Sequence, residues 1–550
     1  MARLNEMFFF IVLTKDNEGV AYGINQSEAK YIITSQDLLH RLDAIKATTP
    51  NLKKIIFIPD ELNPNEKESC KAIENLKSTF QDVKTYQDIL DIGSKKPDVI
   101  FSMPKKDDIA LIMYTSGTSG VPKGVMLTVY HLVEALRNIL RMQEEMKVSL
   151  LNTAYAGYLP MAHLYGYLLN IGSFVSDTTL AFCSPMTMLD HSPAHVPGQI
   201  GDFSLLKPQF IASVPLVLDR IQREIYRKLE SRTPISAPIF TYLMDYKIRW
   251  TQRGFDTPIV NRLISKQINA QFGGNLQIMM VGSAPLAPRS QALIKAALNV
   301  HMLQGYGCTE CTAVSHAMTG TDLNYGECGV PMHTTKCYLK DWSEGGYYVN
   351  DKPNPRGEIV LGGSTIAKGY YKMPKETAEA FIIDENGETW FETADIGEIL
   401  PNGTLKIIDR KKDLTKLPNG EFVSLGNIEA SLRSNQYIEN ICVCVDPFVN
   451  HLVALITPNR KSLEELAIKL KKPLNIEKLC KDEEVIRIVK QSIDDMSKKI
   501  GFKKIETPKK IALVKEEWTQ DNDLLTAAFK LKRKQVNEYY KKTIEQLFKD

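Results

Sequence analysis

Short, continuous apolar runs alternate with longer amphipathic stretches through the first part of the chain. Residues 31–34 and 54–59 are apolar runs, and between them the apolar positions of residues 35–47 have helical spacing. Continuous apolar strands that alternate with helices are typical of a buried parallel sheet. The pattern therefore predicts βα units over residues 1–110. Two polar stretches within them are expected to be loops, at residues 61–70 and 93–107.

The alternation of strand and helix recurs further along the chain. Leu132, Val133, Leu136 and Leu140 have helical spacing and indicate a helix over residues 128–147. Beyond residue 410, a region of about 140 residues is long enough to have a core of its own. The other elements that we expect are helices at 217–230 and 290–300 and strands at 276–281, 357–363, 441–445 and 452–457.

The composition is that of an ordinary globular protein with more than one domain. The chain has 550 residues, of which 43% are hydrophobic and 24% are charged, and its net charge is +3. So small a net charge creates no global field that would recruit nucleic acid or an anionic membrane. Nine scattered cysteines, an odd number, argue against a disulfide framework and for a reducing compartment.

Two segments were weighed against this classification, a C-x-x-C pair and an early apolar run, and neither changes it. Cys308 and Cys311 have C-x-x-C spacing, but no second C-x-x-C and no paired histidines accompany them, which disfavours a metal or redox site. The longest early apolar run, residues 7–13, is too short to span a bilayer and lacks the cleavage site of a signal peptide. No spanning segment is expected later in the sequence.

Residues 111–125 hold the sharpest change in composition. An apolar run ends abruptly in four hydroxyl residues, interleaved glycines and one lysine. Glycines let successive N–H groups approach an anion, and hydroxyls and the lysine add donors and charge, so the stretch is suited to a triphosphate. It is not a Walker loop, because the G-x-x-x-x-G-K-[ST] pattern is absent. A plain surface turn is the alternative. The residues expected to contact phosphate are Thr115, Ser116, Gly117, Thr118, Ser119, Gly120 and Lys123.

Two later stretches are candidates for the rest of a nucleotide site. Small residues follow the strand at 276–281, and the carboxyl ends of strands are where open α/β sheets bind nucleotides. Downstream, a tyrosine between two glycines can offer its face to a base, and a Thr-Glu pair supplies oxygen ligands for Mg²⁺. The alternative for this second stretch is a glycine-rich turn with a capping Thr-Glu. The candidates are Gly282, Ser283, Ala284, Pro285, Gln304, Gly305, Tyr306, Gly307, Thr309 and Glu310.

Six motifs, in order along the chain, resemble those of the adenylate-forming superfamily, which includes acyl-CoA synthetases, luciferases and peptide-synthetase adenylation domains. They lie at residues 114–125, 158–163, 301–310, 390–397, 405–413 and 525–534. Residues 201–208, 352–358 and 422–426 look most like the eukaryotic long-chain fatty-acyl-CoA synthetases, especially the branch that prefers polyunsaturated chains. The chain begins later than members of that family, which carry an upstream segment and often a membrane anchor.

The resemblance implies roles for single residues outside the phosphate loop. His163, which on its apolar ground alone would be taken for a packed core residue, would lie beside the acyl carboxylate. Asp395 would hold both ribose hydroxyls and Arg410 would contact the ribose. Ala394 stands where the family has glycine, and if that position needs a positive φ, alanine costs about 1 kcal/mol there.

The last two roles concern lysines of the C-terminal part. Lys530 would reach the substrate carboxylate and the α-phosphate, with Lys532 as the alternative if the register is shifted. The small domain would swing at Lys412. With Thr309 and Glu310 on Mg²⁺, the set of catalytic candidates is Lys530, Glu310, Thr309 and His163.

The resemblance also implies the fold and the reaction. We expect an α/β fold with a large multi-sheet adenylation domain at residues 1–409, incomplete at its N-terminus, a hinge at 410–412 and a small mobile α+β domain at 413–550. A long-chain fatty acid would react with Mg·ATP to give acyl-AMP, and coenzyme A would then displace AMP. Nucleic acid is not an expected partner. Relatives usually lie on the cytosolic face of endoplasmic reticulum, mitochondrial or peroxisomal membranes, and peripheral membrane association stays open.

Two other functions are compatible with the same residues. The chain could be a fatty-acyl-AMP ligase that donates to a carrier protein, although no carrier domain follows Asp550 in this sequence. It could also be a catalytically impaired lipid- or nucleotide-binding relic, given the late start and Ala394. Omitting coenzyme A from a thioester assay tests the first, and saturable ATP binding without AMP production would favour the second.

Overall fold

A computed structural model describes most of the chain, and its contacts divide it into two compact units. The first unit contains Met1–Leu132, Ala367–Glu379 and Gln520–Asp523, and the second contains Val133–Ile366, Ala380–Thr519 and Leu524–Asp550. The described residues are 8–10, 17–61, 66–80, 82–96, 103–115, 122–145, 153–189, 192, 196, 198–233, 235–419, 421–520, 522–526 and 529–549.

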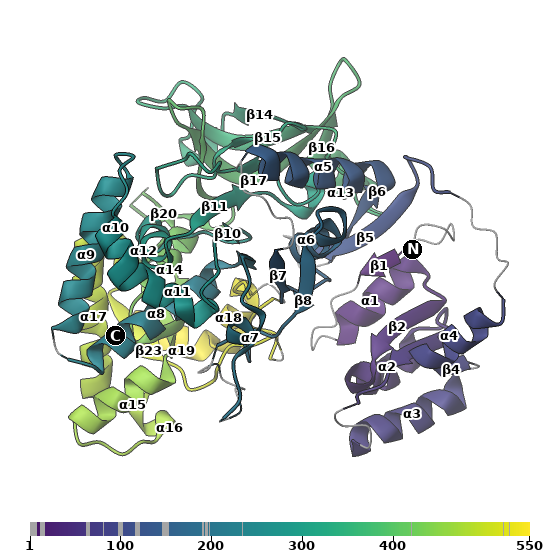
Figure 1. Ribbon diagram of the computed structural model, residues 1–550, viewed down its shortest axis with the longest axis horizontal. Coiled ribbons are helices and arrows are strands. Elements are labelled where there is room, and N and C mark those ends of the chain that lie inside the picture. The colour runs from purple at the N-terminus through teal and green to yellow at the C-terminus, as the bar shows by residue number, and fades with distance from the viewer. Residues whose placement is uncertain are drawn as a thin grey trace. The chain divides into compact units, whose positions relative to one another are not determined.

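The first unit has a small parallel sheet of the expected βα type (Figure 1). Its strands are β2 (Tyr31–Ser35), β3 (Lys54–Ile58) and β4 (Asp82–Thr85), and its helices are α1 (Asn17–Ser27), α2 (Leu39–Ile45), α3 (Lys67–Thr79) and α4 (Tyr86–Ser94). The core forms around Ile55 of β3, Leu39 and Leu42 of α2 and Leu76 of α3.

Two details of this sheet differ from the sequence-based expectation. Residues 67–70, expected in a loop, are the first turn of α3, whose buried Ser69, Ala72 and Leu76 give it an inner face. The strands are also not buried on both faces, because Ile33 and Ile58 are more than half exposed. The alternation of inward and outward side chains along β2 and β3 is that of a sheet with one covered face.

A second sheet of the first unit contains the two strands that enclose the phosphate-loop sequence. Strand β5 (Ile109–Thr115) pairs in parallel with β1 (Phe8–Phe10) and antiparallel with β6 (Lys123–Thr128), and Thr115 is the partner of Lys123. Residues 367–371 continue along β6, where the Met126 N–H donates to the Gly369 carbonyl. The helix α13 (Pro374–Ala380) follows.

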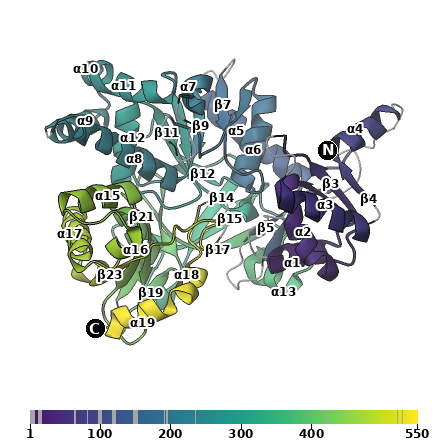
Figure 2. The same cartoon turned by 90° about the horizontal axis from the view of Figure 1, so that it is seen from below.

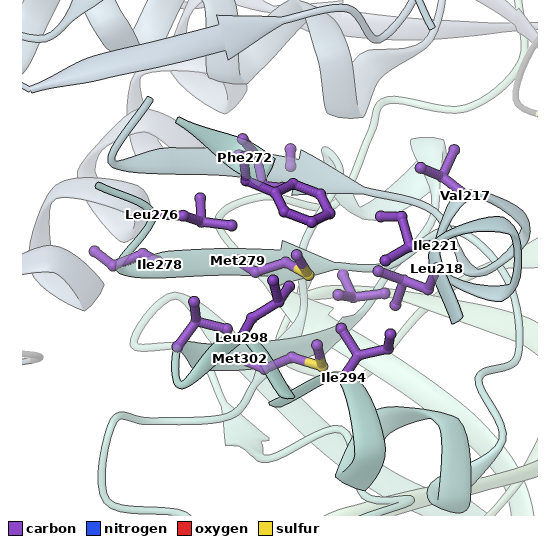
Figure 3. Packing of buried hydrophobic residues seen from close by; sticks show 14 of the residues in the cluster. Val217, Leu218, Ile221, Phe272, Leu276, Ile278, Met279, Ile294, Leu298 and Met302 are labelled. Carbon is purple, nitrogen blue, oxygen red and sulfur yellow. The ribbon is translucent and has the colours of Figure 1, made fainter. Parts of the chain in front are cut away.

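The second unit is built on a seven-stranded sheet in the order β13-β12-β11-β10-β9-β7-β8, whose central strands are parallel. Figure 3 shows residues of two covering helices, among them Leu218 and Ile294, packed around Met279 of β10. The strands are β7 (Ala154–Gly157), β8 (Thr179–Phe182), β9 (Phe210–Ser213), β10 (Ile278–Val281), β11 (His301–Tyr306), β12 (His316–Ala317) and β13 (Val330–Pro331). The helices that accompany them are α6 (Leu164–Val175), α7 (Asp202–Leu206), α8 (Pro215–Glu230), α9 (Ser236–Thr251), α10 (Pro258–Val260), a π-helical turn (Asn261–Ser265), α11 (Lys266–Asn269) and α12 (Pro288–Leu298).

The helix that follows β6 is α5 (Val129–Glu145), and its inner face is not the apolar stripe read from the sequence. Val133 is exposed, and Leu132, Leu136 and Leu140 are only partly buried. The side chain of Asn138 is buried because it has a polar partner, the Thr334 hydroxyl, to which its Nδ2 donates over 2.5 Å. Buried polar groups that keep hydrogen bonds do not carry the desolvation penalty that hydropathy patterns assume.

A five-stranded antiparallel sheet carries the segment with the predicted ribose contacts. Its strands β15 and β18 both pair with the long strand β17. The bounds are β14 (Thr335–Lys340), β15 (Arg356–Gly363), β16 (Phe381–Ile383), β17 (Thr389–Ile399) and β18 (Leu405–Arg410).

The part of the second unit after residue 413 has a core of its own, centred on the three-stranded sheet β21-β22-β23 (Figure 2). Its strands are β19 (Leu414–Lys416), β20 (Phe422–Ser424), β21 (Ile438–Cys444), β22 (Val453–Pro458) and β23 (Lys510–Leu513). Its helices are α14 (Leu425–Leu432), α15 (Arg460–Lys469), α16 (Ile476–Leu479), α17 (Glu483–Ile500), α18 (Arg533–Tyr539) and α19 (Lys541–Lys549). Among the helices of the described residues, none is both long and apolar enough to cross a membrane.

Candidate active site

Asp395 and Arg410 are brought together by the pairing of β17 with β18, in which they are register partners. The Arg410 Nε lies 3.2 Å from one carboxylate oxygen of Asp395, and the Tyr306 hydroxyl donates to the other over 2.7 Å. Burial, and next the charge of Asp395, raise the pKa of Tyr306 well above its ordinary value, so the phenol stays a neutral donor. Three segments far apart in sequence thus meet at one buried carboxylate.

Ala394, the residue before this carboxylate, has a φ of +58°. The expected positive φ is therefore present, in the left-handed region that favours glycine. Both sides of the Ala394 peptide unit are held by hydrogen bonds: its N–H donates to Glu358 Oε1 over 3.1 Å, and its carbonyl accepts from the Lys411 N–H over 2.9 Å. Surrounding contacts of this kind maintain a strained residue.

Glu358 is a residue of this site that the sequence interpretation did not single out. It lies on β15, its side chain is almost fully buried, and its second oxygen is 2.7 Å from Lys411 Nζ. A carboxylate within a buried strand, directly before an apolar run, was the available signal, because such a group needs a specific partner. Glu358 connects β15, the Ala394–Asp395 segment of β17 and the predicted hinge.

Lys530 lies near the same cluster, in a turn that its own backbone closes. The Thr526 N–H donates to the Lys530 carbonyl over 2.8 Å, and the Lys530 N–H donates to the Thr526 hydroxyl over 3.0 Å. Burial, followed by the positive charge of Arg410, lowers the pKa of Lys530 to about 8, while Asp395 opposes the shift. The amine is therefore close enough to Arg410 and Asp395 to sense both charges.

Arg533, three residues further on, fixes this turn to the C-terminal part. Its guanidinium forms a two-pronged pair with Glu429, at 2.7 and 2.9 Å, and donates to the Val443 carbonyl over 2.9 Å. Such fork-to-fork pairs hold a side chain in one orientation.

His163 is the residue directly before α6 and caps its N-terminus. Its Nδ1 accepts a hydrogen bond from the Tyr165 N–H over 3.2 Å. Burial, with the charge of Lys530 as the second cause, lowers the pKa of His163 to about 4, so the imidazole is neutral near pH 7. Because Nδ1 is the acceptor, the ring hydrogen belongs on Nε2, which makes His163 an uncharged donor.

The small-residue loop at 282–285 and the strand end at 304–307 lie side by side, since Val281 of β10 pairs with Gln304 of β11. Ser283 has a φ of +80°, and its buried hydroxyl, like Gln304 Oε1, has no hydrogen-bond partner among the described residues. Unsatisfied buried acceptors and donors are costly unless a ligand completes them. Two such atoms at the carboxyl ends of neighbouring parallel strands fit a hydrogen-bonding ligand such as a nucleotide.

Gly307, one of the two glycines beside Tyr306, has a packing role that the sequence interpretation did not include. A side chain at residue 307 would lie 1.8 Å from the Ala313 carbonyl oxygen, so glycine is required there by backbone packing. The Tyr306 ring is itself partly exposed and lies 6.2 Å, between centroids, from the His316 ring. Its partial exposure leaves room for a base to stack.

Thr309 and Glu310 stand in a single 3₁₀ turn, Thr309–Cys311, that follows this strand end. The C-x-x-C cysteines are free thiols: the Cys308 N–H donates to Cys311 Sγ over 3.2 Å, and that thiol donates to the Cys308 carbonyl. Within the ranges that the structure describes, no group of three or more His, Cys, Asp or Glu side chains could hold a metal ion.

The phosphate-loop candidates belong to the first unit, and only part of them can be described. Ser116, Gly117, Thr118, Ser119 and Gly120 lie outside the described residues. Thr115 ends β5 and Lys123 begins β6. The ammonium of Lys123 lies 4.7 Å from the centre of the Tyr370 ring, a cation–π distance.

The predicted hinge, residues 410–412, begins at Arg410, the partner of Asp395. Burial, with the charge of Arg410 as the second cause, lowers the pKa of Lys412. One residue before Arg410, the Asp409 carboxylate accepts hydrogen bonds from the Ser424 hydroxyl and from the Arg410 N–H. The segment is therefore tied both to β17 and to the strand β20 of the C-terminal part.

Comparison with known proteins places the chain in a family. Residues 11–371 match the AMP-binding enzyme family. The chain is 34% identical to long chain acyl-CoA synthetase 8 of Arabidopsis thaliana over 538 residues, which are 96% of this chain and 74% of that protein. It is 30% identical to long-chain-fatty-acid–CoA ligase 3 of Saccharomyces cerevisiae over 551 residues, 98% of this chain and 77% of that protein.

Solved structures give the same fold. The adenylation domain of a carboxylate reductase from Mycobacterium chelonae superposes with a TM-score of 0.79 at 23% identity, over 100% of this chain and 77% of that one. The corresponding domain from Segniliparus rugosus, in complex with AMP and a carboxylic acid, gives 0.77 at 21% identity, over 100% and 79%. The chain belongs to the AMP-binding enzyme family, among its long-chain acyl-CoA synthetases. The family and the α/β fold predicted from the sequence are both confirmed.

Proposed function

We propose that the protein converts a long-chain fatty acid to its acyl-CoA in two steps. The fatty carboxylate attacks the α-phosphorus of ATP, so that a carboxylate oxygen–phosphorus bond forms and pyrophosphate leaves. The thiol sulfur of coenzyme A then attacks the acyl carbon, and AMP leaves with the bond electrons. A carboxylate is a poor acyl donor because its leaving group is oxide, and adenylation replaces oxide with AMP. The protein has mainly to position the reactants and to neutralise charge.

The observation that carries the proposal is the meeting of Asp395, Arg410 and Lys530 in a chain of this family. A carboxylate, a guanidinium and an ammonium from three separate segments share one electrostatic environment. Asp395 would accept from the ribose hydroxyls and Arg410 would hold it there, while Tyr306 would pack on adenine. Lys530 would stand between the incoming carboxylate and the α-phosphate, two anions that repel each other without a cation.

The remaining phosphate contacts would come from the loop of the first unit, through Thr115, Lys123 and the hydroxyls and glycines between them. Thr309 and Glu310 would hold Mg²⁺, since a hydroxyl and a carboxylate are the hard oxygen donors that this ion prefers beside phosphate oxygens. When bound, Mg²⁺ would offset the negative charge of the leaving pyrophosphate.

His163 would orient the fatty carboxylate without adding charge. Its neutral ring, with Nδ1 occupied by the Tyr165 N–H, leaves Nε2–H as the donor for a substrate oxygen. Lys530, whose charge contributes to the lowered pKa of His163, would approach the same carboxylate.

The second step needs space for coenzyme A, and we propose that residues 413–550 form a small domain that rotates at Lys412 to provide it. The separate core around β21, β22 and β23 supports a rigid body of this kind. Rotation would withdraw Lys530 from the adenylate, because Arg533 ties its turn to Glu429 and Val443.

The direct test is AMP release from ATP with fatty acids from C8 to C22, saturated and polyunsaturated, with and without coenzyme A. We expect AMP turnover to require both a long-chain acid and coenzyme A, and acyl-CoA to form in equal amount. Thioester formed on a carrier protein but not on coenzyme A would support the ligase alternative. Saturable ATP binding without AMP in any mixture would overturn the proposed activity.

A further inference from the structure

One face of α9 carries a row of large apolar side chains that are not buried. Ile235, Ile239, Tyr242 and Tyr246 follow one another at intervals of three and four residues, so they lie along one side of the helix. They are exposed by 64%, 51%, 65% and 39%. Single exposed apolar residues are ordinary, but a continuous row marks an interaction surface.

The row continues beyond the end of α9 through ring contacts. The centroid of the Trp250 ring lies 6.1 Å from that of Tyr246 and 5.6 Å from that of Phe255, which is 59% exposed. In both views α10 lies beside α9, and the exposed Ile259 and Leu263 belong to α10 and the π-helical turn (Figures 1 and 2). We call the surface formed by these residues the α9 face.

The α9 face belongs to a firmly packed helix, not to a loosely attached one. Its opposite side buries Phe240 and Met244 in the core of the large sheet. Lys247 is buried with them, and its ammonium donates to Asn261 Oδ1, Ser265 Oγ and Asn299 Oδ1. These bonds fasten α9 to the π-helical turn and to the end of α12, so the exposed row has a fixed shape.

Positive side chains outnumber negative ones in the segment that forms the α9 face. Within residues 235–266, the exposed charged residues are Arg249, Arg253, Arg262 and Lys266, against two exposed acids, Asp245 and Asp256. The Asp256 carboxylate already accepts hydrogen bonds from the Thr257 N–H and Asn261 Nδ2. The Arg253 guanidinium lies 5.6 Å from the centre of the Trp250 ring. Although the net charge of the chain is small, this surface is locally basic.

We propose that the α9 face is a docking surface for an anionic phospholipid bilayer. Tyrosine and tryptophan favour the boundary between hydrocarbon and water, aliphatic side chains enter the acyl region, and arginines keep their charge at the headgroups. A helix that lies in the interface needs this combination of residues and need not span the membrane. If the proposed function holds, such docking brings the enzyme to the phase in which long-chain fatty acids accumulate.

The test is binding of the full chain to vesicles of phosphatidylcholine alone and of phosphatidylcholine with phosphatidylserine. One variant combines Ile239→Ser, Tyr242→Ser and Phe255→Ser, and a second combines Arg249→Gln and Arg253→Gln. The control is Phe448→Ser, since Phe448 is 90% exposed, away from α9 in the loop between β21 and β22. We expect the apolar variant to lose about tenfold or more in binding to the mixed vesicles and the control to lose none.

We expect the arginine variant to bind the mixed vesicles only as strongly as vesicles of phosphatidylcholine alone. Added salt should also weaken binding of the wild type to the mixed vesicles. Binding is measured without substrates, so this outcome does not depend on the proposed activity. Equal binding by wild type and both variants would overturn the proposal. So would a chain that binds no vesicles but forms a dimer that the apolar variant abolishes. Far-UV circular dichroism and thermal unfolding that match those of the wild type would show that the variants fold.

Discussion

At the scale of single residues, the candidate site depends on groups that hold the reacting ones in place. Asp395, the proposed ribose ligand, follows Ala394, which has a left-handed conformation, and Glu358 and Lys411 hold that conformation from both sides. Glu358 touches no substrate in the proposed mechanism. It is a positioning residue, and its effect should therefore appear in nucleotide affinity.

We expect Glu358→Ala to weaken ATP binding about tenfold and to destabilise the protein by about 1–3 kcal/mol, because the Ala394 N–H and Lys411 lose a buried acceptor. Glu392→Ala is the matched control: it lies on β17 and pairs with Lys340, which is half exposed. Isothermal titration with ATP and thermal unfolding provide the two readouts. Equal effects of the two substitutions would contradict the positioning role.

The second residue-scale prediction concerns pH. The pKa of Lys530 is lowered from 10.5 to about 8 by burial and by Arg410, so the cation is lost at a pH where an ordinary lysine is still charged. The kcat/KM of ATP–pyrophosphate exchange, which reports on the free enzyme, should therefore fall about tenfold per pH unit above this pKa.

Lys530→Arg provides the control for this profile. Arginine stays protonated, so the decline should move to a higher pH even if the overall rate is lower. A profile for Lys530→Arg that coincides with that of the wild type would mean that another group causes the decline.

At the scale of elements, a buried ionic contact joins α8 of the large sheet to the C-terminal part. Arg223 donates to Glu439 over 2.7 Å and to the carbonyl of Ile438 over 2.6 Å, and Arg220 donates to the other oxygen of Glu439. Burial raises the pKa of Glu439, but the two arginines outweigh it and lower the pKa below its ordinary value. This contact holds β21, and with it the Lys530 turn, against the large sheet.

We expect Glu439→Gln to destabilise the protein by about 3 kcal/mol, because the buried Arg223 and the partly exposed Arg220 lose their counter-charge. If the contact also holds the adenylating arrangement, pyrophosphate exchange should fall severalfold more than acyl transfer from added acyl-AMP. Glu388→Gln removes a pair whose lysine, Lys336, is mostly exposed, and should change stability by less than about 0.5 kcal/mol. Equal effects of the two variants on stability and on the half-reactions would contradict this role of the contact at α8.

Patterns along the sequence predicted where helices and strands lie better than they predicted which side of each is buried. The strand and the helix of residues 276–300 were predicted because apolar runs and helical spacing are local properties. The inner face of α5 was not, because Asn138 is buried through a hydrogen bond to Thr334, which is distant in sequence. Glu358 was missed for the same reason, since its partners Ala394 and Lys411 come from other strands.

Resemblance, and not periodicity, pointed to the site residues. It anticipated the positive φ at Ala394 and selected Lys530, which the structure places within the electrostatic reach of Asp395. The reason for Gly307 could not be inferred, because it depends on the close approach of the Ala313 carbonyl. The central part of the phosphate loop, residues 116–121, lies outside the described residues, so its phosphate contacts stay a prediction.

At the scale of the whole molecule, the proposed mechanism joins an adenylating site to a C-terminal part that would carry one catalytic lysine. Lys530 belongs to a turn that Arg533 fixes to the C-terminal core, whereas Asp395 and Arg410 belong to the five-stranded sheet. In the proposed mechanism, one rigid part would supply the cation for the first step and withdraw it for the second. The two half-reactions should differ in their need for this lysine.

The measurement that tests this most directly compares the half-reactions of Lys530→Ala. Pyrophosphate exchange with a long-chain fatty acid should fall by about 10²–10³-fold, since a charge that is needed in the transition state is removed. Thioester formation from coenzyme A and presynthesised acyl-AMP should stay within about threefold of the wild type. Equal loss in both half-reactions, or full pyrophosphate exchange without the lysine, would contradict the account.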